Sequence, residues 1–101
     1  MAVTLDPERN EIDALLRSAG DLSGKRVLEI GAGAGRLTWR YASRAKEVVG
    51  IDPKPDRIAR AHDEMPEGLR GRVVMLETML EEYAGAAQAR LFDVALMSWS
   101  L

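Results

Sequence analysis

Residues 27–35 read Val-Leu-Glu-Ile-Gly-Ala-Gly-Ala-Gly, an apolar run that ends in closely spaced glycines. Such a run is typical of a short buried strand that leads into a tight loop. Residues 36–42, Arg-Leu-Thr-Trp-Arg-Tyr-Ala, can begin a helix directly after that loop. A strand, a glycine loop and a helix start in this order form a cradle for a nucleotide-type cofactor. The residues around the glycines then indicate which cofactor fits.

Strand-like and helix-like segments alternate along the rest of the chain. Asp6 as N-cap and Pro7 in the first turn predict a helix that ends near Gly20. Strands are predicted at residues 26–30, 47–52, 72–76 and 91–98, and further helices around residues 37–45, 56–65 and 78–87. This alternation implies a parallel sheet with right-handed crossovers. We therefore predict an α/β fold, Rossmann-like with three αβα layers, in one domain over residues 1–101.

Length, charge and composition restrict the classes of function. The chain has 101 residues, a formal net charge of -2 and no cysteine. This charge gives no general attraction to nucleic acid or anionic membranes, and the lack of cysteine excludes disulfides and thiolate metal sites. The start of the sequence has no signal-peptide pattern, and no apolar run approaches the ~20 residues of a spanning helix. We expect a cytoplasmic domain with no membrane partner, no metal and no nucleic-acid partner.

The spacing of the glycines separates two classes of cofactor. A dinucleotide loop has the pattern G-x-G-x-x-G, whose third glycine would fall at Arg36. Here the glycines alternate from Gly31 to Gly35, and Glu29 stands two residues before the first of them. Asp52 ends the next predicted strand, where a carboxylate can accept hydrogen bonds from both ribose hydroxyls. An acid there suits either class, so binding of a dinucleotide such as NAD is kept as the less favoured alternative.

Both acids also have purely structural alternatives. Glu29 can pair with a nearby arginine, and Asp52 can cap the helix that follows the turn. His62, the only histidine, is predicted to be a boundary residue in mid-helix rather than a general base, because a base needs hydrogen-bond reach to the substrate. Trp39 and Tyr41 are too few to form a base-stacking platform, and we interpret them as packing residues.

The pattern acid-x-G-x-G-x-G at residues 29–35 resembles motif I of the class I S-adenosylmethionine-dependent methyltransferases. Residues 48–53, Val-Val-Gly-Ile-Asp-Pro, resemble the second strand of that family, and residues 92–96 resemble its fourth strand. The resemblance runs from about the first helix to Leu101 and implies a sheet of order 3-2-1-4-5-7-6. The chain would supply the 3-2-1-4 part and be truncated after strand four. Strand four would then be an unpaired edge open to self-association or to a partner chain.

The resemblance also assigns roles to individual positions. Glu29 would accept a hydrogen bond from the ammonium group of the cofactor, directly or through water. The glycine loop would form the floor, and Asp52 would hold the ribose. Pro53 would pack on the adenine. In the family an acid often meets the adenine amino group after strand three, but Thr78 stands there, so Met79 or backbone groups would substitute. The predicted cofactor-binding set is Glu29, Gly31, Ala32, Gly33, Gly35, Asp52, Pro53, Thr78, Met79 and Ser98.

The predicted reaction is in-line attack of an acceptor on the sulfonium methyl group of S-adenosyl-L-methionine. Much of the protein's task is then to align and desolvate two reactants, and the sequence points to no catalytic base. Residues 97–100, Met-Ser-Trp-Ser, lack the Asn/Asp-Pro-Pro-aromatic signature of enzymes that methylate amino groups of bases or of glutamine. This favours a small-molecule acceptor. The alternative is a non-catalytic module that binds S-adenosylmethionine, or a half-domain that a partner chain completes.

Overall fold

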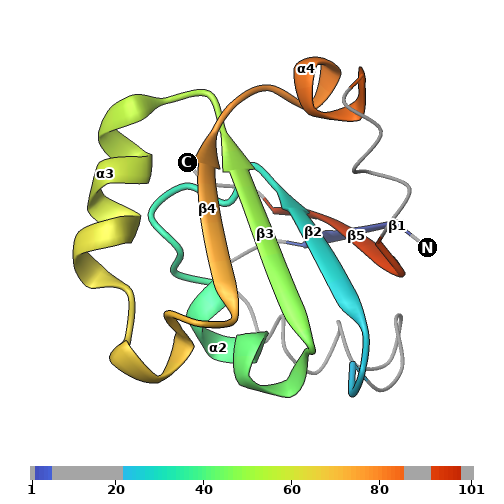
Figure 1. Cartoon of the computed structure of the whole chain (residues 1–101). Helices are drawn as coiled ribbons and strands as arrows, with labels where there is room; N and C mark the ends of the chain where they lie inside the picture. Colours follow the sequence, from blue (N-terminus) through green and yellow to red (C-terminus); the bar gives the residue numbers. More distant parts are fainter. Residues whose placement is uncertain (1, 6–21, 86–91, 99–101) are drawn as a thin grey trace.

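The computed structural model describes residues 2–5, 22–85 and 92–98. Figure 1 shows a parallel sheet with helices against it. The strands are β1 (Ala2–Leu5), β2 (Arg26–Ile30), β3 (Glu47–Asp52), β4 (Val73–Glu77) and β5 (Val94–Ser98). The helices are α2 (Thr38–Tyr41), α3 (Pro55–Glu64) and α4 (Leu80–Gly85), with 3-10 turns η1 (Ala42–Arg44) and η2 (Glu67–Leu69). The helix predicted from Asp6 to Gly20 lies outside the described residues.

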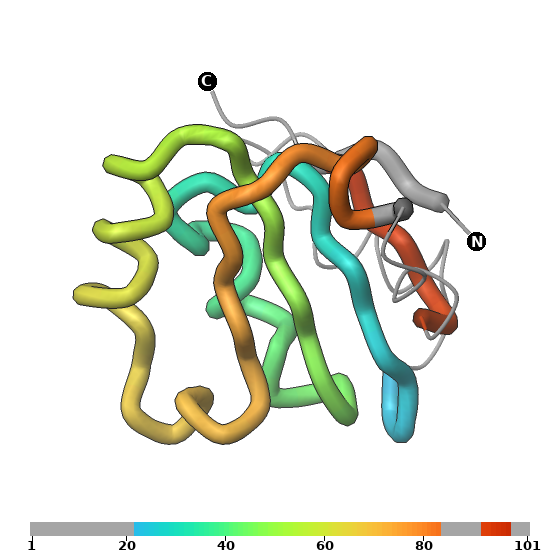
Figure 2. Tube along the Cα trace, turned by 45° about the horizontal axis from the view of Figure 1, so that its top comes forward, coloured from blue at the N-terminus to red at the C-terminus, as the bar shows by residue number. Residues whose placement is uncertain are grey.

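The sheet has the order β1-β5-β2-β3-β4. Its last four members reproduce the predicted order 3-2-1-4, because β4, β3, β2 and β5 are the predicted third, second, first and fourth strands. The chain moves outward from β2 to β4 and then returns to the other side of β2 with β5. In open α/β sheets, ligands bind at the carboxyl ends of the strands around such a reversal. Figure 2 shows the loops that leave β2, β3 and β4 gathered at this end.

The strand β1 was not predicted, and it corrects one expectation. It pairs in parallel with β5, from Ala2 opposite Ala95 to Leu5 opposite Ser98. The prediction that the fourth strand forms an unpaired edge is therefore wrong. A four-residue strand is too short to show a hydrophobic period, and an exposed edge can recruit it because its backbone groups need partners. The edge on which self-association was expected is thus occupied by β1.

Buried apolar side chains lie on both faces of the sheet. One face carries the main core, in which Val27, Val48 and Leu96 contact buried side chains of the segment after β2 and of α3. The predicted apolar stripe Leu37, Tyr41 and Ala45 is buried there, although only residues 38–41 are α-helical. On the other face, Leu28, Val49 and Ile51 pack with Ile30, Tyr83 and Phe92. Every helix in the described part of the chain is too short or too polar to span a membrane.

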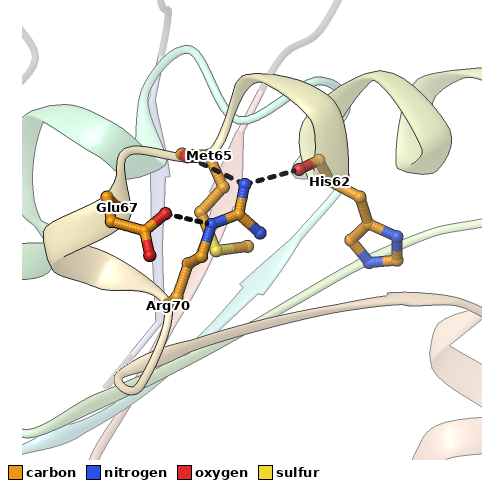
Figure 3. A network of polar contacts seen from close by, with 4 residues as sticks. All are labelled: His62, Met65, Glu67 and Arg70. Atoms are coloured by element: carbon orange, nitrogen blue, oxygen red, sulfur yellow. Dashed lines mark hydrogen bonds and ion pairs between the residues drawn. The ribbon is translucent and has the colours of Figure 1, made fainter.

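The end of α3 is held by an arginine rather than by a glycine cap (Figure 3). The Arg70 guanidinium donates to the carbonyl oxygens of His62 and Met65 at 3.3 and 3.4 Å, and its Nε donates to Glu67 at 2.9 Å. These bonds satisfy carbonyls that a helix end leaves without partners. His62 itself has its Nε2 3.0 Å from the carbonyl oxygen of Met75. The histidine therefore ties α3 to β4, in agreement with its interpretation as a boundary residue.

Gly50 lets the loop after β2 rest on β3. A Cβ at this position would lie 2.6 Å from the Met75 sulfur and 2.9 Å from the Ala32 Cβ. We expect Gly50→Ala to lower the free energy of unfolding by about 1–3 kcal/mol, as overpacked cores do. Urea unfolding measures this loss. Gly68→Ala is the control, because nothing lies within 4 Å of its Cβ position. Equal stability of the two variants would contradict the contact between Ala32 and β3.

Candidate functional site

The loop after β2 begins at the carboxyl edge of the sheet and is bonded to β3. The amides of Gly31 and Ala32 both donate to the Ile51 carbonyl oxygen, at 2.9 and 3.1 Å. Gly31, Gly33 and Gly35 have φ angles of 76°, 59° and 90°. Only glycine adopts these angles without steric strain. The alternation of glycines seen in the sequence therefore corresponds to three left-handed backbone positions in one loop.

Gly35 has a second reason to lack a side chain. A Cβ there would lie 2.2 to 2.8 Å from three carbons of the Trp39 indole. The indole thus lies directly against the loop backbone, and the Trp39 amide donates to the Gly35 carbonyl oxygen at 3.0 Å. Trp39 also packs against the main core. The interpretation of Trp39 as a packing residue is confirmed. Its indole packs on the glycine loop as well as on the core.

Asp52 joins the two loops of the site. Its side chain is almost fully buried, with 2% of the residue exposed. One carboxylate oxygen accepts the Gly33 amide at 3.0 Å, and the other accepts the Lys54 amide at 2.9 Å. The Arg57 guanidinium lies 3.9 Å from the first of these oxygens. The N-cap of α3 is Lys54, so Asp52 does not cap that helix and instead bridges the glycine loop to the turn after β3.

Glu29 is fully buried beneath α2. Its Oε1 accepts a hydrogen bond from the Thr38 hydroxyl at 2.7 Å and another from the Tyr41 hydroxyl at 2.6 Å. Burial raises the pKa of Tyr41 well above 10, and the nearby charge of Glu29 and the hydrogen bond raise it further. Tyr41 therefore keeps its proton and remains a donor throughout the neutral range. The sequence marked Tyr41 only as a packing residue and did not single out Thr38.

The remaining predicted residues lie along the same edge of the sheet. Pro53 follows Asp52 and is exposed. Thr78 donates its amide to the Asp52 carbonyl oxygen at 3.1 Å, and the exposed Met79 comes next. Ser98 ends β5 opposite Leu5. Within the described residues, no group of three or more acidic or histidine side chains could hold a metal ion. The edge thus brings the glycine loop, Asp52 and the residues after β4 together.

Comparison with known proteins identifies the class. A family model for a methyltransferase domain matches residues 27–101, and the chain belongs to this family. The cofactor of the family is S-adenosylmethionine. Two solved structures share the fold. An RNA methyltransferase from Salinibacter ruber with bound S-adenosylhomocysteine has a TM-score of 0.72 and 23% identity, over 91% of this chain and 60% of that one. Magnesium protoporphyrin IX methyltransferase from Synechocystis with bound S-adenosylmethionine has a TM-score of 0.64 and 22% identity. The match covers 87% of this chain and 41% of that one.

Curated relatives are more similar in sequence and much longer. The chain is 42% identical over 59 residues to a magnesium-protoporphyrin O-methyltransferase of Rhodobacter capsulatus, covering 58% of this chain and 26% of the relative. It is 38% identical over 71 residues to a ubiquinone biosynthesis O-methyltransferase of Acinetobacter baylyi, covering 66% of this chain and 30% of that relative. The chain therefore spans less than a third of the length of either relative.

Proposed function

We propose that this chain binds S-adenosylmethionine at the carboxyl edge of its sheet and forms the cofactor-binding part of an enzyme that methylates a small molecule. The observation that carries the proposal is the position of Asp52, a buried carboxylate at the end of β3 that contacts the glycine loop. A carboxylate is a strong acceptor for a pair of ribose hydroxyls. The bare backbone of Gly31 to Gly35 lets a ligand approach more closely than a Cβ would permit.

The residues of the edge fit the parts of this cofactor. Asp52 would hold the ribose, the glycine loop would form the floor, and Pro53 with Thr78 and Met79 would border the adenine. The predicted contact between Glu29 and the ammonium group is left out of the proposal, because the Glu29 side chain is fully buried. A contact with Ser98 stays a prediction. Bound S-adenosylmethionine supplies an electrophilic methyl group on a sulfonium. The protein's own contribution is to orient the cofactor and to exclude water from it.

The acceptor is proposed to be a small molecule that is methylated on oxygen. The support is the names of the two curated relatives, which are both O-methyltransferases of small-molecule pathways. The lack of the Asn/Asp-Pro-Pro-aromatic signature and the slightly negative charge agree with this choice. A cytoplasmic location stays a prediction from the sequence.

Calorimetric titration of the chain tests the proposal. We expect S-adenosylmethionine and S-adenosylhomocysteine to bind at one shared site and NAD to bind far more weakly. A preference for NAD would overturn the assignment of the cofactor. A second assay follows methyl transfer from radiolabelled cofactor to a pool of small-molecule hydroxyl compounds. Cofactor binding without transfer to any acceptor would replace the proposed enzyme with the binding-module alternative.

A further inference from the structure

A buried cluster of three polar side chains links the strand before the glycine loop to the helix after it. Glu29, Thr38 and Tyr41 each have 0% of their surface exposed. Both hydroxyls donate to the same carboxylate oxygen, at 2.7 and 2.6 Å. Hydrogen bonds to a charged acceptor are stronger than neutral ones, and more so where water is excluded. The cluster is therefore a strong link between β2 and α2.

The link spans the two ends of the loop. Glu29 is the last but one residue of β2, and Thr38 and Tyr41 are the first and last residues of α2. Between β2 and α2 lie residues 31–37, of which three are glycines. Glycine loses more conformational freedom on folding than any other residue. The cluster fixes both ends of this loop, in addition to the bonds that the loop itself makes to Ile51 and Asp52.

We infer that Glu29 is a positioning residue, which acts on the cofactor through Thr38, Tyr41 and the shape of the glycine loop rather than by touching the ligand. Since all of Glu29 is buried, its carboxylate has no surface to offer a ligand while the two hydroxyl bonds are in place. The effect on cofactor affinity rests on the proposed function, whereas the effect on the loop does not.

The test uses Glu29→Gln, Thr38→Val and Tyr41→Phe in the full chain. The first probe pair is S-adenosylhomocysteine and 5′-methylthioadenosine, which lacks the amino-acid half of the cofactor. We expect each variant to weaken both ligands by the same factor, between about 2-fold and 30-fold, the usual range for residues that couple to a site without contacting it. The second readout is hydrogen exchange of the loop amides in the ligand-free protein, which should become faster in all three variants.

Val73→Ala is the control for a loss of stability alone. Val73 is buried at the start of β4, the end of the strand farthest from the site. It should lower the melting temperature and leave both the ligand affinities and the loop exchange unchanged below that temperature. If the three cluster variants behave like this control, the cluster is merely structural and the inference is wrong.

A direct contact gives a different result. In that case Glu29→Gln weakens S-adenosylhomocysteine but not 5′-methylthioadenosine, and Thr38→Val and Tyr41→Phe leave both affinities unchanged. That pattern would overturn the inference. If the wild-type chain binds neither ligand, the proposed function fails, but the exchange readout still decides the inference. Faster exchange in the three cluster variants, with no change in Val73→Ala, would support the inference that the cluster fixes the loop. Unchanged exchange in the cluster variants would refute it.

Discussion

Gly35→Ala is expected to lower the free energy of unfolding by about 2–5 kcal/mol, the sum of left-handed backbone strain and overpacking. The φ angle of Gly35 is 90°, and its Cβ would fall 2.2 Å from the nearest Trp39 carbon. Domains of this size are typically stable by only about 5–15 kcal/mol. The variant should therefore lie near the limit of folding, and urea unfolding followed by circular dichroism measures the loss.

Gly24→Ala separates the two contributions. Gly24 has a φ of 73°, but nothing lies within 4 Å of its Cβ position. Gly24→Ala should lower the free energy of unfolding only by the cost of the left-handed backbone, about 1–2 kcal/mol. Gly35→Ala should cost less in a Trp39→Ala background than in the wild type, because the indole is what the new methyl group meets. Equal losses at the two glycines would show that Trp39 does not rest on the loop.

The order of the sheet could be predicted because it depends on patterns that repeat. Each of the four predicted strands is an apolar run, and each is followed or preceded by a turn or helix signal, so the crossovers leave few topologies. The strand β1 escaped prediction because its pairing with β5 is decided by a free edge elsewhere in the chain and not by its own four residues. The helix after the loop is likewise shorter than its apolar stripe predicted, since it changes to a 3-10 turn at Ala42.

The sequence likewise indicated only some features of the candidate site. The spacing of the glycines and the place of Asp52 at a strand end are local features, so the sequence could indicate them. The partners of Glu29 are not local, because they depend on how α2 packs over β2. One signal was present: Thr38 and Tyr41 are three residues apart and so lie on one helix face. A buried acid at Glu29 requires hydrogen-bond donors, and two hydroxyls on that face supply them.

Asp52→Asn should weaken S-adenosylmethionine binding by about 10-fold to 150-fold, which corresponds to a loss of about 1.5–3 kcal/mol for bonds to a charged group. The amide nitrogen of asparagine cannot accept a hydrogen bond, so one of the two acceptor positions for ribose is lost. The same substitution leaves either the buried Gly33 amide or the partly buried Lys54 amide without its partner. We expect a stability loss of about 1–3 kcal/mol from that group.

The two effects are separated by measuring affinity calorimetrically at a temperature where the variant is fully folded. Asp63→Asn is the matched control, because Asp63 is exposed on α3 and carries the same change of charge. It should bind the cofactor as the wild type does. If Asp52→Asn also binds normally while losing stability, the carboxylate serves only to join the glycine loop to the turn after β3. Asp52 would then leave the proposed site, and the ribose would need another acceptor along the edge. If only Asp52→Asn loses affinity, the same carboxylate both holds the glycine loop and binds the ligand. The shape of the loop is then coupled to the ligand that lies on it.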